Sequence, residues 1–158
     1  MLAQATLARP LLVLDTNVVL DWIAFDDQRV RPIAAAIERK ALPLVSNDAC
    51  LQELRRALAY TQVKLDAGAQ TRALGRYLAQ AEMFELAVPA SATDFPQCED
   101  PDDQKFIDLA WHARASHLLT RDKALLKLAR RLSHRFAVLV PDAFLIWMAA
   151  QARPWPQS

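Results

Sequence analysis

Glycine is scarce in this chain, with only Gly68 and Gly75 among 158 residues. Both lie inside segments whose apolar residues recur at helical spacing. P-loops and dinucleotide-binding loops need glycine where the backbone approaches a phosphate group, at a turn that follows a strand. We therefore expect no nucleotide-cofactor binding of either kind.

Cysteine is equally rare, and long apolar runs are missing. Cys50 and Cys98 form no CxxC motif and are too few for a disulfide framework, which favours a reducing cytoplasm. No apolar run approaches the length of a membrane span, and the first residues lack the pattern of a signal peptide. With 19 Lys and Arg residues against 18 Asp and Glu residues, the net charge of +1 indicates no particular partner.

Short apolar runs alternate with segments of helical periodicity. The runs predict buried strands at 11–14, 42–45, 117–120 and 136–140, with a weaker fifth strand at 86–88. Helices are predicted at 29–41, 47–60, 69–84, 103–115, 123–132 and 142–152. This alternation predicts an α/β fold with a mainly parallel sheet. We expect a single domain over 1–150 and a loose tail over 151–158.

Two carboxylates follow two of these strands. Asp15 comes directly after the run 11–14, where an ionised carboxylate close to the core is costly unless something pairs with it. Asp122 follows the run 117–120. In a parallel sheet both residues project from the carboxyl edge, where open α/β folds bind their ligands.

Two further acids are expected near the same edge, although each has a simpler interpretation. Asp102 is a plausible N-cap, and Asp103 a favourable charge in the first turn of a helix. The two acids already expected at this edge favour a functional role for Asp103. Glu53 borders the apolar stripe of the helix at 47–60, where an acid is usually a solvated flank, but it could lean over the same edge.

A cluster of carboxylates repels itself unless cations neutralise it. Oxygen ligands favour Mg²⁺ or Mn²⁺ over zinc, and His112, His117 and His134 show no metal-ligand spacing. Such an ion, with positions open to water and phosphate, supports hydrolysis of a phosphodiester bond. The sequence therefore predicts that Asp15 binds a metal ion.

Four segments, in this order, resemble the motifs of PIN-domain ribonucleases: "LDTNVVLDW", "LQELRRAL", "DPDDQKFIDLA" and "LLTRD". The resemblance implies a Rossmann-like three-layer α/β/α sandwich and metal-dependent cleavage of RNA. The acids that it assigns to catalysis and metal binding are Asp15, Glu53, Asp103 and Asp122. It assigns supporting roles to Asn17, Thr120 and Asp102. Many small members are VapC-like toxins of type II toxin–antitoxin modules, which are typically homodimers silenced by a small antitoxin.

The residues that would contact RNA are less specific. Arg55 and Arg56 follow Glu53 closely, and Arg121 and Lys123 begin a basic segment, but an ordinary solvated helix face explains that segment equally well. A second hypothesis is a catalytically silent RNA- or partner-binding α/β module with an acidic ion-binding pocket. A haloacid-dehalogenase type of phosphatase is disfavoured, because its second Asp is replaced by Asn17.

Overall fold

The computed structural model describes residues 10–85 and 97–151. Its strands are β1 (Leu12–Leu14), β2 (Leu44–Ser46), β3 (Ala81–Met83), β4 (His117–Leu119) and β5 (Ala137–Leu139). The α-helices are α2 (Thr16–Ile23), α3 (Arg31–Glu38), α4 (Asp48–Leu58), α5 (Ala67–Leu78), α6 (Gln104–His112), α7 (Lys123–Leu126), α8 (Ala129–Leu132) and α9 (Pro141–Gln151). Two 3₁₀-helices are η1 (Thr61–Val63) and η2 (Pro101–Asp103).

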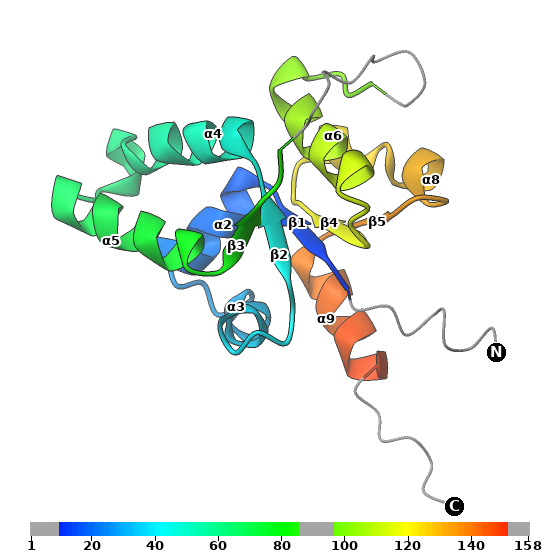
Figure 1. Cartoon of the computed structure of the whole chain (residues 1–158), viewed down its shortest axis with the longest axis horizontal. Coiled ribbons are helices and arrows are strands. Elements are labelled where there is room, and N and C mark those ends of the chain that lie inside the picture. The colour runs from blue at the N-terminus through cyan, green and yellow to red at the C-terminus, as the bar shows by residue number, and fades with distance from the viewer. Residues whose placement is uncertain (1–9, 86–96, 152–158) are drawn as a thin grey trace, which may run out of the picture.

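The five strands form one parallel sheet in the order β3-β2-β1-β4-β5 (Figure 1). Leu12 of β1 pairs with Leu44 of β2 on one side and with His117 of β4 on the other. The chain builds outward from β1 to β3 and then returns to β4, so the order of the strands reverses between β1 and β4. Such a switch point, at the carboxyl ends of the strands, is where open α/β sheets form a ligand crevice.

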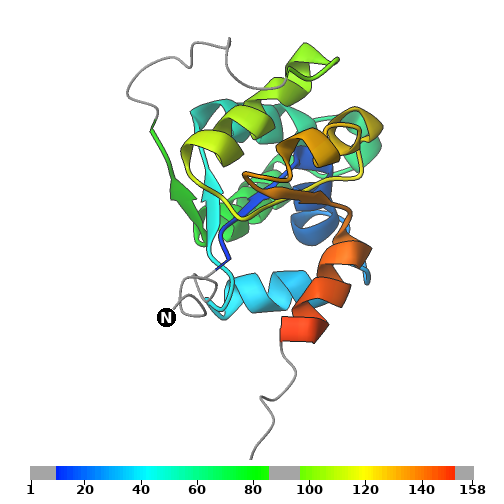
Figure 2. The ribbon, with the colours of Figure 1, turned by 90° about the vertical axis from the view of Figure 1, so that its right-hand side faces the viewer.

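Helices cover both faces of the sheet (Figures 1 and 2). Leu12 and Leu14 point into a core cluster with α2, α3, α5 and α9, whereas Val13 points into a second cluster with α6, α7 and α8. This alternation is the two-residue period of a strand. The helix α4 contributes to both clusters, through Leu54 to the first and Cys50 to the second. The predicted three-layer α/β fold is confirmed.

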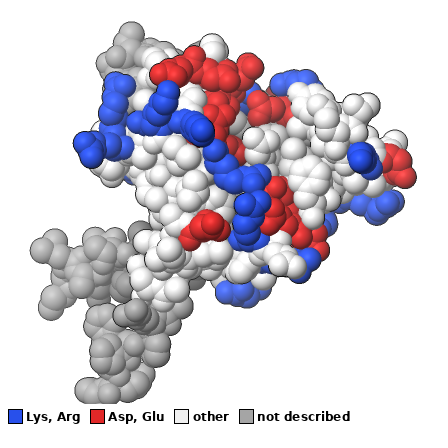
Figure 3. All heavy atoms as spheres, turned by 180° about the vertical axis from the view of Figure 1, so that it is seen from behind, with Lys and Arg blue, Asp and Glu red and all other residues white. Residues whose placement is uncertain are grey.

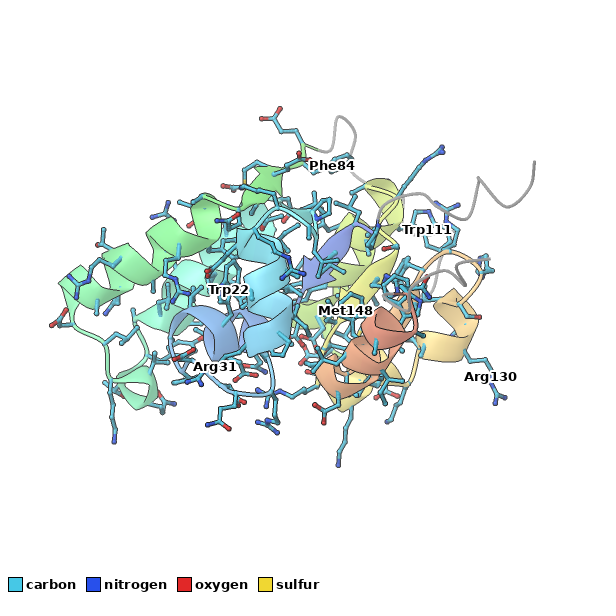
Figure 4. All side chains as sticks on the ribbon, turned by 90° about the horizontal axis from the view of Figure 1, so that it is seen from below. Trp22, Arg31, Phe84, Trp111, Arg130 and Met148 are labelled. Carbon is cyan, nitrogen blue, oxygen red and sulfur yellow. The ribbon has the colours of Figure 1, made fainter. Side chains whose placement is uncertain are left out.

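Two tryptophans mark the separation of the two clusters. Trp22 is buried in the first, where its indole N–H donates a 2.8 Å hydrogen bond to Glu38. Trp111 packs beside the second, with the Arg135 guanidinium 4.1 Å from the centre of its ring. Figure 4 shows Trp22 near the middle of the molecule and Trp111 well apart from it, toward the right of the view.

Several predicted boundaries were wrong. The helix expected over 69–84 ends at Leu78, and Ala81–Met83 forms the edge strand β3, because pairing with β2 outweighs the helical pattern of these residues. The weak strand predicted at 86–88 lies outside the described residues. The residues after Asp15 form α2, a helix that was not predicted from the sequence.

The helix expected over 123–132 is divided into two single turns, α7 and α8. Leu125, Leu128 and Leu132 from this divided segment are all buried in the second core cluster. Within residues 10–85 and 97–151, no helix combines the length and the apolar character needed to cross a membrane.

Candidate active site

A pocket of about 210 Å³ opens at the carboxyl edge of the sheet, beside the switch point between β1 and β4. Five of its lining residues are predicted site residues: Asp15, Asn17, Glu53, Asp103 and Asp122. The others are Thr16, Leu20, Ala57, Tyr60 and Phe106. The fold thus brings together four acids that are spread over more than one hundred residues of sequence.

Asp15 is fixed by two hydrogen bonds at the end of β1. It is the N-cap of α2, and its Oδ1 accepts a 3.2 Å hydrogen bond from the backbone N–H of Val18. Its Oδ2 accepts a hydrogen bond from the hydroxyl of Thr120. Its side chain is almost fully buried, and burial raises its pKa although these hydrogen bonds oppose the rise.

Thr120 connects Asp15 to Asp122. The Thr120 hydroxyl donates to Asp15 and accepts a 2.9 Å hydrogen bond from the backbone N–H of Asp122. Asp122 is the N-cap of α7, with its Oδ1 2.8 Å from the backbone nitrogen of Ala124. Because Thr120 is fully buried, this connection is protected from competing water.

Asp103 is the acid without a compensating partner. It ends η2, and its Oδ2 is buried without a hydrogen-bond donor. Burial, followed by the closeness of the Asp122 carboxyl, raises the pKa of Asp103 to about 7. Two neighbouring carboxyls can share a hydrogen bond only when one of them holds a proton, so a nearby positive charge would stabilise the pair once both are ionised.

Glu53 is held by the protein at both of its oxygens. Its Oε1 lies 2.6 Å from the Nζ of Lys105, and its Oε2 accepts a hydrogen bond from the Thr16 hydroxyl. The Glu53 and Lys105 side chains are 22% and 19% exposed, so the ion pair is shielded from much of the solvent. Glu53 does lean over the edge of the sheet, in contact with a basic residue.

The remaining predicted residues lie elsewhere. Asp102 is exposed, and the cap of η2 is Asp100, whose Oδ1 accepts from the Asp102 N–H, so Asp102 is not the N-cap residue. Arg55 lines a separate pocket with α5, and Arg121 forms a 2.6 Å ion pair with Asp21 in another. Arg56 and Lys123 are exposed. None of the four basic residues proposed to contact RNA lines the acidic pocket.

Sequence reasoning missed Thr16, Tyr60 and Lys105. A signal existed for Lys105, which lies two residues after Asp103 and at the start of a helix, where a positive charge opposes the helix dipole. Thr16 and Tyr60 carried no such signal, because neither a hydroxyl after an acid nor an aromatic at a helix end is unusual.

The donor chemistry of the pocket fits a hard divalent cation. Its acids offer only oxygen, and Asp103 contributes a buried oxygen without a partner. In this conformation, however, no three His, Cys, Asp or Glu side chains of residues 10–85 and 97–151 are grouped closely enough to hold an ion. The acids are gathered around one space without forming a closed set of ligands.

Comparisons with known proteins give one family. The sequence profile of the PIN domain matches residues 11–124 of this chain. Among solved structures, the PIN domain of RRP44 from T. brucei is similar, with 13% sequence identity and a TM-score of 0.49. That similarity covers 91% of this chain and 83% of the other. No curated protein matches this chain.

Proposed function

The chain belongs to the PIN domain family, whose members are generally nucleases, and from this premise we propose that it is a Mg²⁺- or Mn²⁺-dependent endoribonuclease. The observation that carries the proposal is the unpartnered Asp103 beside Asp122. Two neighbouring carboxyls, one of them with a buried oxygen that has no hydrogen-bond partner, form a group of atoms that a divalent cation would stabilise.

Asp15, Glu53, Asp103 and Asp122 are the proposed ligands. A bound divalent ion lowers the pKa of an attacking water and stabilises the leaving oxygen in phosphodiester hydrolysis. The protein's own contribution is to fix its acids before substrate arrives. Thr120 and the N–H of Val18 orient Asp15, and the start of α7 orients Asp122.

RNA would approach over the face that carries the exposed charges. Figure 3 shows a band of Lys and Arg side chains crossing one face of the molecule beside groups of Asp and Glu. Cations bind the phosphate backbone irrespective of sequence. Tyr60, which is 53% exposed and lines the acidic pocket, offers a surface on which a base could stack.

The finer role that we propose is that of a toxin in a type II toxin–antitoxin module. It would act in the cytoplasm as a homodimer and be silenced by a small antitoxin protein. This part of the proposal is supported by the motifs of the sequence that resemble those of VapC-like toxins. A catalytically silent module that binds RNA or a partner is the competing function.

Cleavage of RNA by the purified protein, with Mg²⁺, Mn²⁺ or EDTA, tests the proposal. We expect Asp103→Asn to abolish a metal-dependent cleavage and Asp102→Asn to leave it intact. The two substitutions make the same chemical change one residue apart, and Asp102 is exposed and outside the pocket. Equal cleavage by both variants would refute the assignment of Asp103. Intact RNA with wild-type protein, across several structured RNAs and both metals, would favour the silent module.

A further inference from the structure

Two of the four acids in the pocket differ in how their charge is balanced. Glu53 has a lysine at one oxygen and a hydroxyl at the other, so its negative charge is already balanced by a cation. Asp103 has a buried oxygen with no donor, and the charged group that acts on it most strongly is another carboxyl, Asp122. An added cation therefore gains more from Asp103 than from Glu53.

Lys105 contacts Glu53 through a 2.6 Å ion pair. It is not among the residues that line the pocket, whereas Glu53 is. Lys105 lies in the first turn of α6, directly after η2 and Asp103, so one short segment supplies both an acid and the cation that balances a different acid. The side chains of the pair are about one-fifth exposed, and a partly desolvated ion pair is costly to break by removing one partner.

We propose that Lys105 is a positioning residue that serves as the site's own counter-ion for Glu53. The divalent ion is then bound by Asp15, Asp103 and Asp122, one ion per site, and Glu53 stays outside its ligand set. This inference rests on the proposed function, and it changes the role of Glu53 from a metal ligand to a carboxylate fixed by Lys105 and Thr16.

The proposal predicts how Mn²⁺ binds to the metal-free protein, which isothermal titration calorimetry measures without any RNA. The wild type should bind one Mn²⁺ per chain, and Asp103→Asn should remove most of this binding. Glu53→Gln should keep one Mn²⁺ per chain but bind it several-fold more weakly, because the Lys105 charge is then uncompensated beside the pocket, and this loss should stay well below that of Asp103→Asn.

Lys105→Met gives the discriminating result. It leaves the Glu53 carboxylate without its cation, so Mn²⁺ should bind at least about tenfold more tightly or in a second equivalent. Lys105→Arg keeps the charge and should behave like the wild type. The double variant Lys105→Met with Glu53→Gln should return to one Mn²⁺ of wild-type affinity, since both members of the pair are then neutral. Circular dichroism and thermal unfolding would verify that each variant is folded.

The possible failures are separable. If the wild type binds no Mn²⁺ at millimolar concentration, the metal-dependent function fails and the inference fails with it. If the wild type binds Mn²⁺ but Glu53→Gln weakens it as much as Asp103→Asn does, Glu53 is a ligand and only the inference is overturned. An Mn²⁺ isotherm of Lys105→Met that matches the wild type would overturn it as well. If Lys105→Met does not fold, Glu53→Gln and Lys105→Arg still decide between these outcomes.

Discussion

The hydroxyl of Thr120 donates a hydrogen bond to the Oδ2 of Asp15, which lies 105 residues earlier in the chain. The two residues follow neighbouring parallel strands, β4 and β1. Because the same hydroxyl accepts from the backbone of Asp122, one buried side chain aligns two acids of the pocket. The geometry of the acidic site is therefore coupled directly to the stability of the sheet.

Replacement of Thr120 by valine should expose this coupling. Valine keeps the branched shape but leaves Asp15 without its donor and the Asp122 N–H without its acceptor. We expect the free energy of unfolding at pH 7 to fall by about 2 kcal/mol, the typical cost of losing a buried hydrogen bond to a charged group. Urea denaturation measures this change. Thr120→Ser should remain close to the wild type. A loss confined to Thr120→Ser, with Thr120→Val unchanged, would implicate packing of the methyl group instead of the hydrogen bonds.

The stability of the metal-free protein should depend on pH through Asp103. Its pKa is about 7 when folded, above its ordinary value of 3.8, so the folded state binds more protons than the unfolded state between these values. Stability from this group is therefore present at low pH and is lost as the pH rises through about 7. Since the side chain is partly exposed, we expect a loss of only about 1–2 kcal/mol.

Denaturation in EDTA at pH 5 and pH 8 measures this effect. The free energy of unfolding of Asp103→Asn, measured relative to the wild type, should be higher at pH 8 than at pH 5, because asparagine carries no charge at either pH. Asp102→Asn, with the same change at an exposed position, should follow the wild type at both values. A pH profile of Asp103→Asn that parallels the wild type would mean that the pKa of Asp103 is not raised in the folded state.

The sequence predicted the sheet and the acids for a physical reason. Short aliphatic runs that alternate with helical patterns favour buried parallel strands, and acids at the carboxyl ends of such strands meet at one edge of the sheet. The same reasoning failed for β3, since Ala81–Met83 has no strand pattern of its own and is half-buried or exposed. Its structure is decided by an available edge of β2, which no local pattern of residues records.

The ion-pair partners of the charged residues could not be predicted from the sequence either. Lys105 is 52 residues from Glu53, and Arg121 is paired with the buried Asp21, on a helix that was not predicted. Spacing along one element indicates which residues share a face, but pairing between elements depends on the packing of both. Arg121 was therefore predicted from the sequence to contact RNA, whereas in the structure it forms an ion pair with Asp21.

Tyr60 should contribute to RNA binding. Stacking of a base on an aromatic ring contributes about 1–3 kcal/mol, so Tyr60→Ala should weaken the binding of single-stranded RNA about tenfold. The measurement is best made by fluorescence anisotropy in the Asp103→Asn background, which should bind RNA without cleaving it. Tyr60→Phe keeps the ring and should bind as tightly as its parent. Weaker binding by Tyr60→Phe would show that the hydroxyl, and not the ring, is recognised.

Arg121 should prove to be a structural residue. Asp21 is buried, with its side chain 7% exposed, and its pKa is raised by burial although Arg121 opposes the rise. Arg121→Met would leave this carboxylate buried without its cation, and we expect the free energy of unfolding to fall by about 2 kcal/mol. The double variant Arg121→Met with Asp21→Asn should recover much of the loss, since the uncompensated charge is then gone.

Lys123→Met is the matched control for this experiment. It removes one positive charge from an exposed side chain that lies two residues after Arg121. Stability should therefore change by less than about 0.5 kcal/mol. RNA affinity separates the two roles: Lys123→Met should weaken RNA binding at low salt, and Arg121→Met should do so only under conditions in which it unfolds. A stable Arg121→Met protein with weakened RNA binding would instead mean that Arg121 leaves Asp21 to contact the phosphate backbone.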